Sequence, residues 1–234
     1  MRFICCALLL LTLRPMLAQE TEIREVPDFD AVDSLYREDQ FYFSFTYNIL
    51  QQKDLGISQN KFSAGLSGGF LRDMPINESR TVAIAAGLGY ALQNYNYDLV
   101  TSEVDGENQY SLIETNSGYD KNKLSLHFVE LPIEFRWRTS TFDSHKFWRV
   151  YTGVKFSYLF YNRSKYVDGS SSEVVTSNKD LNTFRYGVYL ATGYNTWNAY
   201  VYYGINPIFK KSAQLDGAPI ELRTLNVGLM FYIL

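Results

Sequence analysis

The segment that decides the fold is V-E-L-P-I-E-F-R-W-R, which runs from Val129 to Arg138. Its odd-numbered residues are apolar, and four of its five even-numbered residues are charged. Successive side chains of a β-strand point to opposite faces, so this segment predicts a strand with one apolar and one ionic face. In a soluble sandwich the ionic face would meet water. In a membrane barrel the apolar face would meet lipid and the ionic face would line the lumen.

The same alternation of apolar and polar residues recurs along the chain, and it predicts eight strands in all. Most have the 9–11 residues that a tilted transmembrane strand needs, or somewhat more. They cover residues 41–49, 62–70, 81–90, 124–138, 148–160, 184–194, 199–205 and 221–234.

The connections between these segments alternate in length. Those after the first, third, fifth and seventh strands are long, including polar stretches at 94–123 and 163–180. The others are short, including a tight turn at 73–77. Outer-membrane barrels have an even strand number, short periplasmic turns and longer external loops. This pattern predicts both termini in the periplasm and the long loops outside the cell.

A soluble eight-stranded barrel of the lipocalin type is the main alternative fold. Aromatic residues make up 16% of the chain, and several lie near strand ends on the apolar face, as in the aromatic belts of membrane proteins. The expected inner face carries charged and small residues, whereas a soluble lipid-binding barrel would carry apolar ones. These features favour an all-β, eight-stranded antiparallel transmembrane β-barrel of the outer membrane that contacts outer-membrane lipid.

The N-terminus predicts a cleaved signal peptide. Arg2 precedes an apolar run that is too short to span a membrane, and Ala18 is a plausible cleavage residue. Cys6 lies too early in the segment for a lipoprotein signal. Both cysteines fall within the signal, so the mature chain forms no disulfide. The expected organisation is a signal peptide at 1–18, a periplasmic tail at 19–40, either disordered or with a short helix, and the barrel at 41–234.

Composition and length limit the partners of the chain, the way it could cross a membrane and its number of domains. The formal net charge of −3, with no run of lysines or arginines, argues against a nucleic-acid partner. After the signal, no apolar run approaches the roughly 20 residues of a spanning helix, so a membrane crossing would require a barrel. The 234 residues suit one domain with at most a small appendage.

The expected inner face holds the candidate functional residues. Charges withdrawn from water must be paired, and a lumen of eight strands is too narrow for an open channel. A network of ion pairs that fills the lumen is therefore the first interpretation, and a path for protons or ions is the second. The residues are Glu130, Glu134, Arg136, Arg138, Arg149, Lys155, Arg185, Glu221 and Arg223.

The two histidines do not predict a metal or catalytic site. Metal sites without cysteine need clustered histidines and carboxylates, and His127 and His145 fall at opposite ends of the expected barrel. An enzyme acting through His127 and Ser125 at the external rim is a third-ranked alternative. We expect no catalytic residues, no cofactor, no metal and no small-molecule substrate.

The strand that contains the deciding segment has an irregularity. Apolar residues are even-numbered up to Phe128 and odd-numbered from Val129. One extra residue in a strand exchanges its faces, so this change of phase predicts a β-bulge. Pro132 cannot donate to the strand ladder, and we expect it at or beside the bulge.

Three segments resemble the PorT (SprT) proteins. They are F-Y-F-S-F-T-Y-N at 41–48, Q-N-K-F-S-A-G-L-S-G-G-F-L-R-D-M-P-I-N at 59–77, and F-V-E-L-P-I-E-F-R-W-R at 128–138. The turn L-R-D-M-P-I-N is the most specific part, whereas E-L-P-I-E-F is shared with a broader class of PorT-like barrels. The last strand, with Asn226, Gly228, Phe231 and Ile233, also resembles the signal that the barrel insertion machinery recognises, although Leu234 replaces the usual terminal aromatic.

The resemblance implies a non-enzymatic component of the type IX secretion system. That system exports proteins with a C-terminal sorting domain across the outer membrane, and in gliding bacteria it also delivers surface adhesins. The implied partners are other type IX secretion proteins. The alternative is a general barrel, either a structural or adhesin-like protein or a small-solute pore.

Overall fold

The computed structural model describes residues 38–52, 55–59, 61–114, 118–139 and 147–233. The predicted signal peptide, most of the predicted tail and His145 lie outside these residues. No helix within them is long and apolar enough to cross a membrane. Their regular elements are the strands β1 (Gln40–Gln51), β2 (Ala64–Pro75), β3 (Val82–Asn96), β4 (Leu99–Val104), β5 (Glu107–Leu112), β6 (Lys121–Arg138), β7 (Trp148–Asp168), β8 (Ser171–Thr176), β9 (Phe184–Tyr194), β10 (Trp197–Gly204), β11 (Gln214–Leu215), β12 (Ala218–Pro219) and β13 (Arg223–Ile233).

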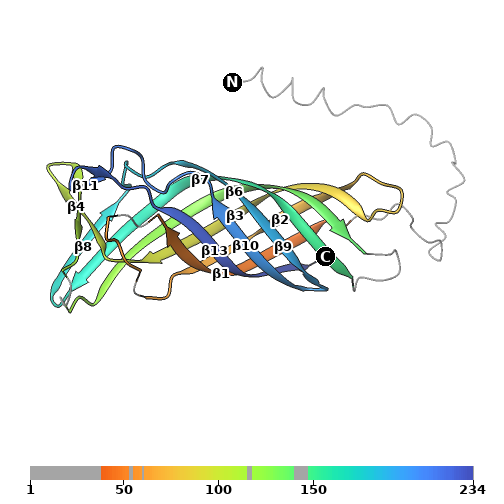
Figure 1. Ribbon diagram of the computed structural model, residues 1–234, viewed down its shortest axis with the longest axis horizontal. Helices are drawn as coiled ribbons and strands as arrows, with labels where there is room; N and C mark the ends of the chain where they lie inside the picture. Colours follow the sequence, from red (N-terminus) through yellow and green to blue (C-terminus); the bar gives the residue numbers. More distant parts are fainter. Residues whose placement is uncertain (1–37, 53–54, 60, 115–117, 140–146, 234) are drawn as a thin grey trace, which may run out of the picture. The chain divides into compact units, whose positions relative to one another are not determined.

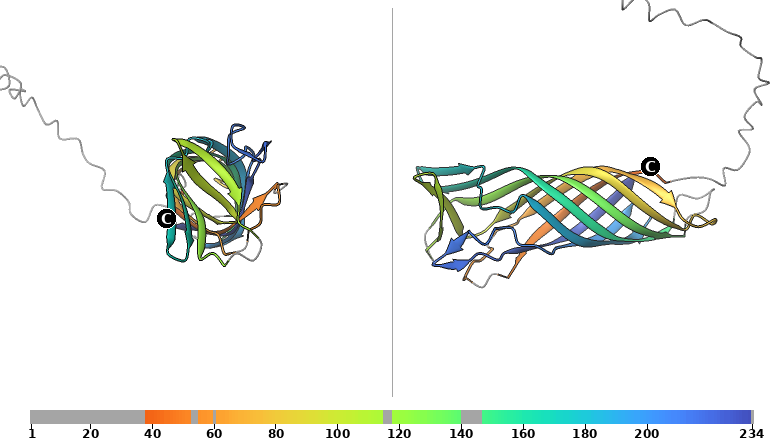
Figure 2. Two further views of the ribbon diagram at one scale, coloured as in Figure 1. Left: turned by 90° about the vertical axis from the view of Figure 1, so that its left-hand side faces the viewer. Right: turned by 90° about the horizontal axis from the view of Figure 1, so that it is seen from above.

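Eight of these strands form a closed antiparallel barrel. The order around the wall is β6, β3, β2, β1, β13, β10, β9 and β7, and pairing of β7 with β6 closes the ring. Figures 1 and 2 show these strands wound at a common tilt around one axis. The predicted all-β, eight-stranded antiparallel barrel is confirmed.

The two ends of the barrel differ. Phe41 of β1 pairs with Ile233 of β13, so the barrel begins and finishes at one end. The connections at that end, 76–81, 139–147 and 195–196, are short, and we call it the short-turn end. The longer connections lie at the other end, the long-loop end, where Figure 1 shows β4, β8 and β11.

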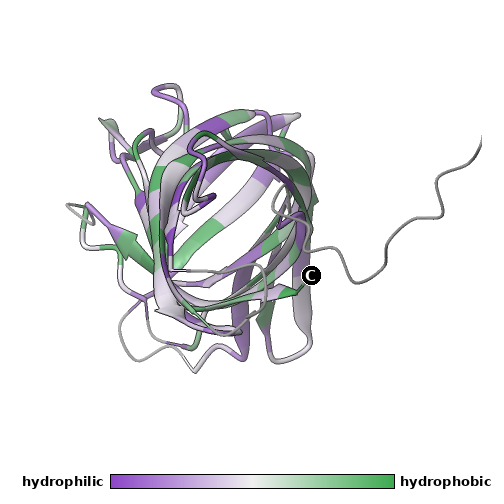
Figure 3. Cartoon of the chain, turned by 90° about the vertical axis from the view of Figure 1, so that its right-hand side faces the viewer, coloured by the Kyte–Doolittle hydropathy of each residue, from purple (hydrophilic) through white to green (hydrophobic). Residues whose placement is uncertain are grey.

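The outside of the barrel carries an apolar band. On β6 the exposed side chains run in alternation from Val129 to Trp137, and the residues between them are buried. From His127 to Trp137 the strand covers about 33 Å, or about 25 Å along the barrel axis at a tilt near 40°, which matches the apolar height of outer-membrane barrels. Figure 3, viewed from the short-turn end, shows hydrophobic and hydrophilic residues interleaved along the strands of the ring.

The predicted bulge occurs, but on β7 and not on β6. His127 pairs with Tyr161 and Phe128 pairs with Leu159, which leaves Phe160 as the extra residue. Both Phe160 and Tyr161 face outward, so it is β7 that exchanges its faces. The even-numbered residues of β6 point inward along its whole length. The expected exchange of faces on β6 is therefore wrong: the lumen itself changes from apolar to charged between Phe128 and Glu130.

Pro132 does not lie at the bulge. It is a buried, inward-facing residue within the regular part of β6. The ladder between β3 and β6 is interrupted there: it stops at the pair Ala86 and Ile133 and resumes at Gly89 and Glu130. Proline has no N–H to donate, which accounts for a gap at this position.

The strands extend further than the alternation predicts at the long-loop end. The stretch 94–123, expected to be loop, contains the hairpin of β4 and β5 and the ends of β3 and β6. The stretch 163–180 contains the end of β7 and all of β8. Lipid imposes an apolar outer face only within the membrane, so strands beyond it need not alternate. At the other end, the expected turn at 73–77 starts late, because β2 continues to Pro75.

Candidate functional site

The inner face of the barrel is the candidate site. Seven of the nine charged residues expected there are buried, with side chains from β6, β7 and β9 on the inward phase of their strands. They are Glu130, Glu134, Arg136, Arg138, Arg149, Lys155 and Arg185. Together with Asp73 they make up what we call the lumen charge cluster.

The remaining two residues, Glu221 and Arg223, do not join this cluster. Glu221 precedes β13 and is exposed at the long-loop end. Arg223 is half-buried and shares its phase with Val227 and Leu229, which point outward. The inward phase of β13 begins at Thr224, so the expectation that 221 and 223 face the lumen is wrong.

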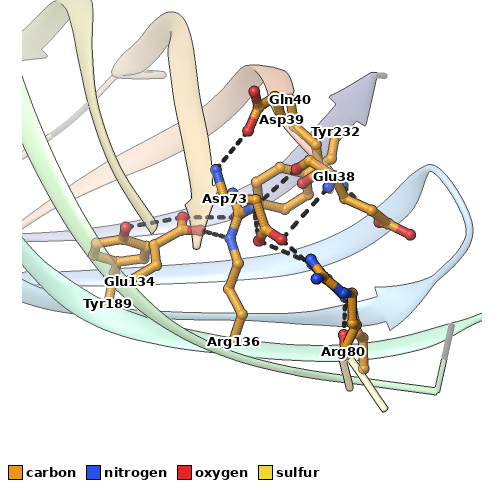
Figure 4. Close-up of polar contacts among 10 residues, drawn as sticks. Glu38, Asp39, Gln40, Asp73, Arg80, Glu134, Arg136, Tyr189 and Tyr232 are labelled. Atoms are coloured by element: carbon orange, nitrogen blue, oxygen red, sulfur yellow. Dashed lines mark hydrogen bonds and ion pairs between the residues drawn. The ribbon is translucent and has the colours of Figure 1, made fainter. Parts of the chain in front are cut away.

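Asp73 lies at the centre of the cluster's short-turn half (Figure 4). Its Oδ1 accepts hydrogen bonds from Nη1 of Arg136 and Nη1 of Arg138, both at 2.9 Å, and its Oδ2 accepts one from Nη2 of Arg138 at 2.8 Å. All three side chains are fully buried. The bidentate contact with Arg138 and the shared contact with Arg136 give this carboxylate the paired environment that a buried charge requires.

Glu134 completes the environment of Arg136. Its Oε2 accepts a hydrogen bond from Nε of Arg136 at 2.8 Å, and its Oε1 accepts from the hydroxyls of Tyr189 at 2.9 Å and Tyr232 at 3.1 Å. The guanidinium of Arg136 also lies 4.8 Å from the ring centroid of Tyr151. Cation–π contact adds to the ion pairs in a site without bulk water.

Residues 38–40 close the lumen at the short-turn end. The backbone oxygen of Glu38 accepts from Nη1 of Arg136 at 3.3 Å, and its backbone N–H donates to Oδ2 of Asp73 at 3.4 Å. Oδ1 of Asp39 accepts from the backbone N–H of Asp73 at 2.8 Å. Figure 4 shows these residues packed against Asp73. The last residues of the expected tail 19–40 therefore belong to the barrel structure.

A second ion pair lies midway along the lumen. Nζ of Lys155 is 3.0 Å from Oε2 of Glu130 and donates to the hydroxyl of Tyr200 at 3.1 Å. It also lies 5.4 Å and 5.6 Å from the ring centroids of Tyr189 and Tyr202. The cavity beside this pair has a volume of only about 10 Å³, which is room for about one water molecule.

Within the described residues, Arg149 and Arg185 lack the carboxylate contacts that Arg136 and Arg138 make. The guanidinium of Arg149 lies 4.5 Å from the ring centroid of Phe147, near Tyr232. Its Nε and Nη1 have no hydrogen-bond partner among the described residues, and neither do the three guanidinium nitrogens of Arg185. The described cluster thus holds more positive than negative side chains, with five cations and three anions.

The long-loop half of the lumen is filled by an apolar core. The inward residues of β6 there are Leu124, Leu126 and Phe128, and loop residues such as Ile208 and Phe209 pack onto them. Hydrogen bonds tie the covering loops together: the hydroxyl of Tyr110 donates to Oδ2 of Asp180 at 3.0 Å. Burial raises the pKa of Tyr110 above its ordinary value, so it stays neutral. The lumen is closed at one end by charge pairs and at the other by this core.

Asp73 is the residue that sequence reasoning missed. It falls in the L-R-D-M-P-I-N segment, which the pattern assigned to a turn. The usable signal was the count of charges, because the expected inner face held two acids and five basic residues on β6, β7 and β9 before the strand register was considered. Pairing Asp73 with arginines more than 60 positions away requires the order of strands, which alternation alone does not give.

His127 has a hydrogen-bond partner other than Ser125. It faces outward, and its Nδ1 is 2.7 Å from the hydroxyl of Tyr90. Ser125 instead donates to Oδ1 of Asn94 at 2.8 Å. No group of three or more metal-binding side chains is present among the residues that the structure describes.

A closed eight-stranded barrel with an apolar belt outside and a polar, filled lumen is the architecture of small outer-membrane barrels. The family of the outer membrane protein beta-barrel domain matches residues 18–210, and the chain belongs to this family. The protein is thus an outer-membrane β-barrel that contacts membrane lipid. No match is found among curated proteins.

Two solved structures align with most of this chain at low sequence identity. Ail, the attachment invasion locus protein of Yersinia pestis, is 12% identical, with 83% of this chain and 99% of Ail covered at a TM-score of 0.37. A structure described under "Asymmetric conductivity of engineered proteins" is 10% identical, with 85% and 100% covered at a TM-score of 0.22. Neither likeness bears on function.

Proposed function

We propose that the protein is a non-enzymatic outer-membrane component of the type IX secretion system, required for export of cargo with a C-terminal sorting domain. In gliding bacteria this would include delivery of surface adhesins. The observation that carries the proposal is the resemblance of its sequence to the PorT family, above all in L-R-D-M-P-I-N at 71–77 and F-V-E-L-P-I-E-F-R-W-R at 128–138.

The contacts at Asp73 support this proposal. The two segments that carry the resemblance lie far apart in the sequence, yet one supplies Asp73 and the other supplies Arg136 and Arg138, its partners in the lumen. Glu130 and Glu134 come from the second segment as well. Residues of both resembling segments therefore contribute to the filled lumen. We propose that the charge cluster serves as a structural plug.

A filled lumen constrains how the protein can act in secretion. Ion pairs and the apolar core occupy the lumen, which leaves no path for folded cargo or for an extended chain. The protein must then act through its surfaces, as a scaffold or a contact for other secretion components. We propose that the short-turn end faces the periplasm with both termini and that the long loops face the exterior, as in other outer-membrane barrels.

The pore alternative makes an opposite prediction for conductance. Purified protein reconstituted into planar bilayers is expected to give no stable conductance steps above the protein-free baseline, because ion pairs and the apolar core close the lumen. An open porin measured in the same bilayers is the positive control. Reproducible steps from the wild-type protein would exclude the plug and favour a small-solute pore.

Affinity purification tests the partners. A short epitope tag inserted at the exposed turn 105–106 leaves both barrel termini unaltered. We expect other type IX secretion proteins to copurify from detergent-solubilised outer membrane and to remain bound through washing. Recovery of the barrel with lipid alone, while a second tagged component of the system still recovers its own partners, would contradict a role as a stable component.

A further inference from the structure

A cluster of positive side chains lies on the outside of the barrel just beyond the apolar band, at the long-loop end. On β6 the outward residues after His127 are Ser125, Lys123 and Lys121. Beyond the bulge the outward residues of β7 include Arg163 and Lys165. The bulge creates this arrangement, because without the extra residue Phe160 the phase of β7 would turn Arg163 and Lys165 into the lumen.

The strand register brings these cations together. Lys123 pairs directly with Lys165, and Ser125 pairs with Arg163. Like charges directly opposite each other on neighbouring strands destabilise a sheet. Burial and the charge of Lys121 also lower the pKa of Lys123 below its ordinary value. A cluster with a purely structural role would therefore need a balancing anion beside these cations.

The nearby acids have other partners or face elsewhere. Oδ2 of Asp120 accepts from the backbone N–H of Gly169 at 3.2 Å, and Oδ2 of Asp168 lies 3.4 Å from the hydroxyl of Tyr166. Glu173 shares its phase with the inward-facing Val175. Within the described part of the chain, none of the four outward cations (Lys121, Lys123, Arg163 and Lys165) forms an ion pair with a carboxylate.

The position of the cluster matches the level of lipid headgroups. Tyr90, His127, Phe160 and Tyr161 form a contiguous outward group of rings, which is typical of a membrane interface. His127 and Lys123 are four positions apart, which is about 13 Å along the strand and about 10 Å along the axis at a tilt near 40°. The cations thus lie directly above the boundary of the hydrocarbon.

We propose that Lys121, Lys123, Arg163 and Lys165 form a binding site for the phosphate groups of phosphorylated lipid in the adjacent leaflet, with the aromatic group seated at the base of the headgroup. This site goes beyond the secretion role, and only its assignment to the outer leaflet rests on the proposed orientation. Positive side chains near a membrane surface attract anionic headgroups in proportion to their number. A phosphate between Lys123 and Lys165 would remove the repulsion across the strands.

Native mass spectrometry of the purified full barrel in detergent tests the site, with bisphosphorylated lipid A and its dephosphorylated form as probes. We expect the wild type to bind the phosphorylated form at least about tenfold more tightly, with affinity falling as salt rises. Equal binding of the two forms would overturn the proposal and favour an acidic protein surface as the partner of the cluster. Because this comparison uses the wild type, it does not depend on any variant folding.

Charge-neutralising variants then locate the site. The triple change K123Q, R163Q and K165Q is expected to lose the preference for the phosphorylated form, whereas the triple change K179Q, K210Q and K211Q alters charge equally at other positions of the long-loop end and should keep it. Heat-dependent gel mobility verifies that each variant is folded. Equal loss in both variants, or none in the first, would overturn the assignment. Binding in purified protein and cargo export in cells can fail separately, and labelling of a tag at 105–106 on intact cells tests the orientation by itself.

Discussion

Replacing Asp73 with asparagine is expected to destabilise the folded barrel by about 3–5 kcal/mol, the usual effect of removing one partner from a buried charge pair. The substitution keeps the size of the side chain but removes the only carboxylate that contacts Arg138 within the described residues, and one of the two that contact Arg136. The buried guanidinium of Arg138 would then have no contacting carboxylate within the described residues, and Arg136 would keep only Glu134.

Urea unfolding of the reconstituted protein, followed by tryptophan fluorescence, measures this effect. The matched control is Asp168→Asn, which removes a carboxylate from an exposed position and should change stability by less than about 0.5 kcal/mol. A change of similar small size for Asp73→Asn would show that the buried arginines do not depend on this carboxylate. In that case the cluster would be hydrated, and its interpretation as a plug would be wrong.

Replacing Gly228 with valine is expected to prevent most of the protein from reaching the folded barrel. Gly228 pairs with Thr46 where the last strand meets the first. A Cβ atom there would overlap the backbone oxygen of Phe45 and lie 2.7 Å from Cα of Thr46. Both are backbone atoms of the closing seam, so relief requires separating β1 from β13, and we expect a loss of about 3 kcal/mol or more.

Gly118→Val is the control for Gly228, because a Cβ at Gly118 meets no atom within 4 Å. The folded fraction after insertion into lipid vesicles, measured by heat-dependent gel mobility, distinguishes the two. Valine has a higher β-propensity than glycine, so propensity alone predicts that Gly228→Val stabilises the strand. A folded fraction equal to that of the control would show that the seam has room and that glycine is not required for closure.

The parts of the fold that follow from the sequence are those that lipid imposes. Within the membrane every second residue faces hydrocarbon, so alternation located all eight barrel strands and most of the inward charges. Beyond the membrane that constraint ends, and the polar residues of β7 and β8 gave no strand pattern. The wrong expectation that β6 exchanges its faces has a related cause. The inward face of β6 is apolar up to Phe128 and charged from Glu130, and alternation alone cannot distinguish such a change of character from a change of phase.

The candidate site required information that no single strand contains. Alternation places Arg136 and Arg138 inside, but only the wall order β6, β3, β2 brings Asp73 to them across the intervening strand β3. Glu38 likewise enters the cluster through its backbone N–H and C=O groups, which have no sequence signature. Glu221 lies outside the barrel wall because β13 begins only at Arg223, and strand boundaries are the feature that a sequence pattern predicts least accurately.

Deletion of the gene in its own bacterium tests the proposed secretion role most directly. The measurement is the amount of sorting-domain cargo on the cell surface and in the medium, with total outer-membrane protein as the reference. The account predicts that cargo is lost from the surface and accumulates in the periplasm, that other outer-membrane proteins persist, and that the wild-type gene restores delivery. Normal delivery of cargo in the deletion strain would contradict it.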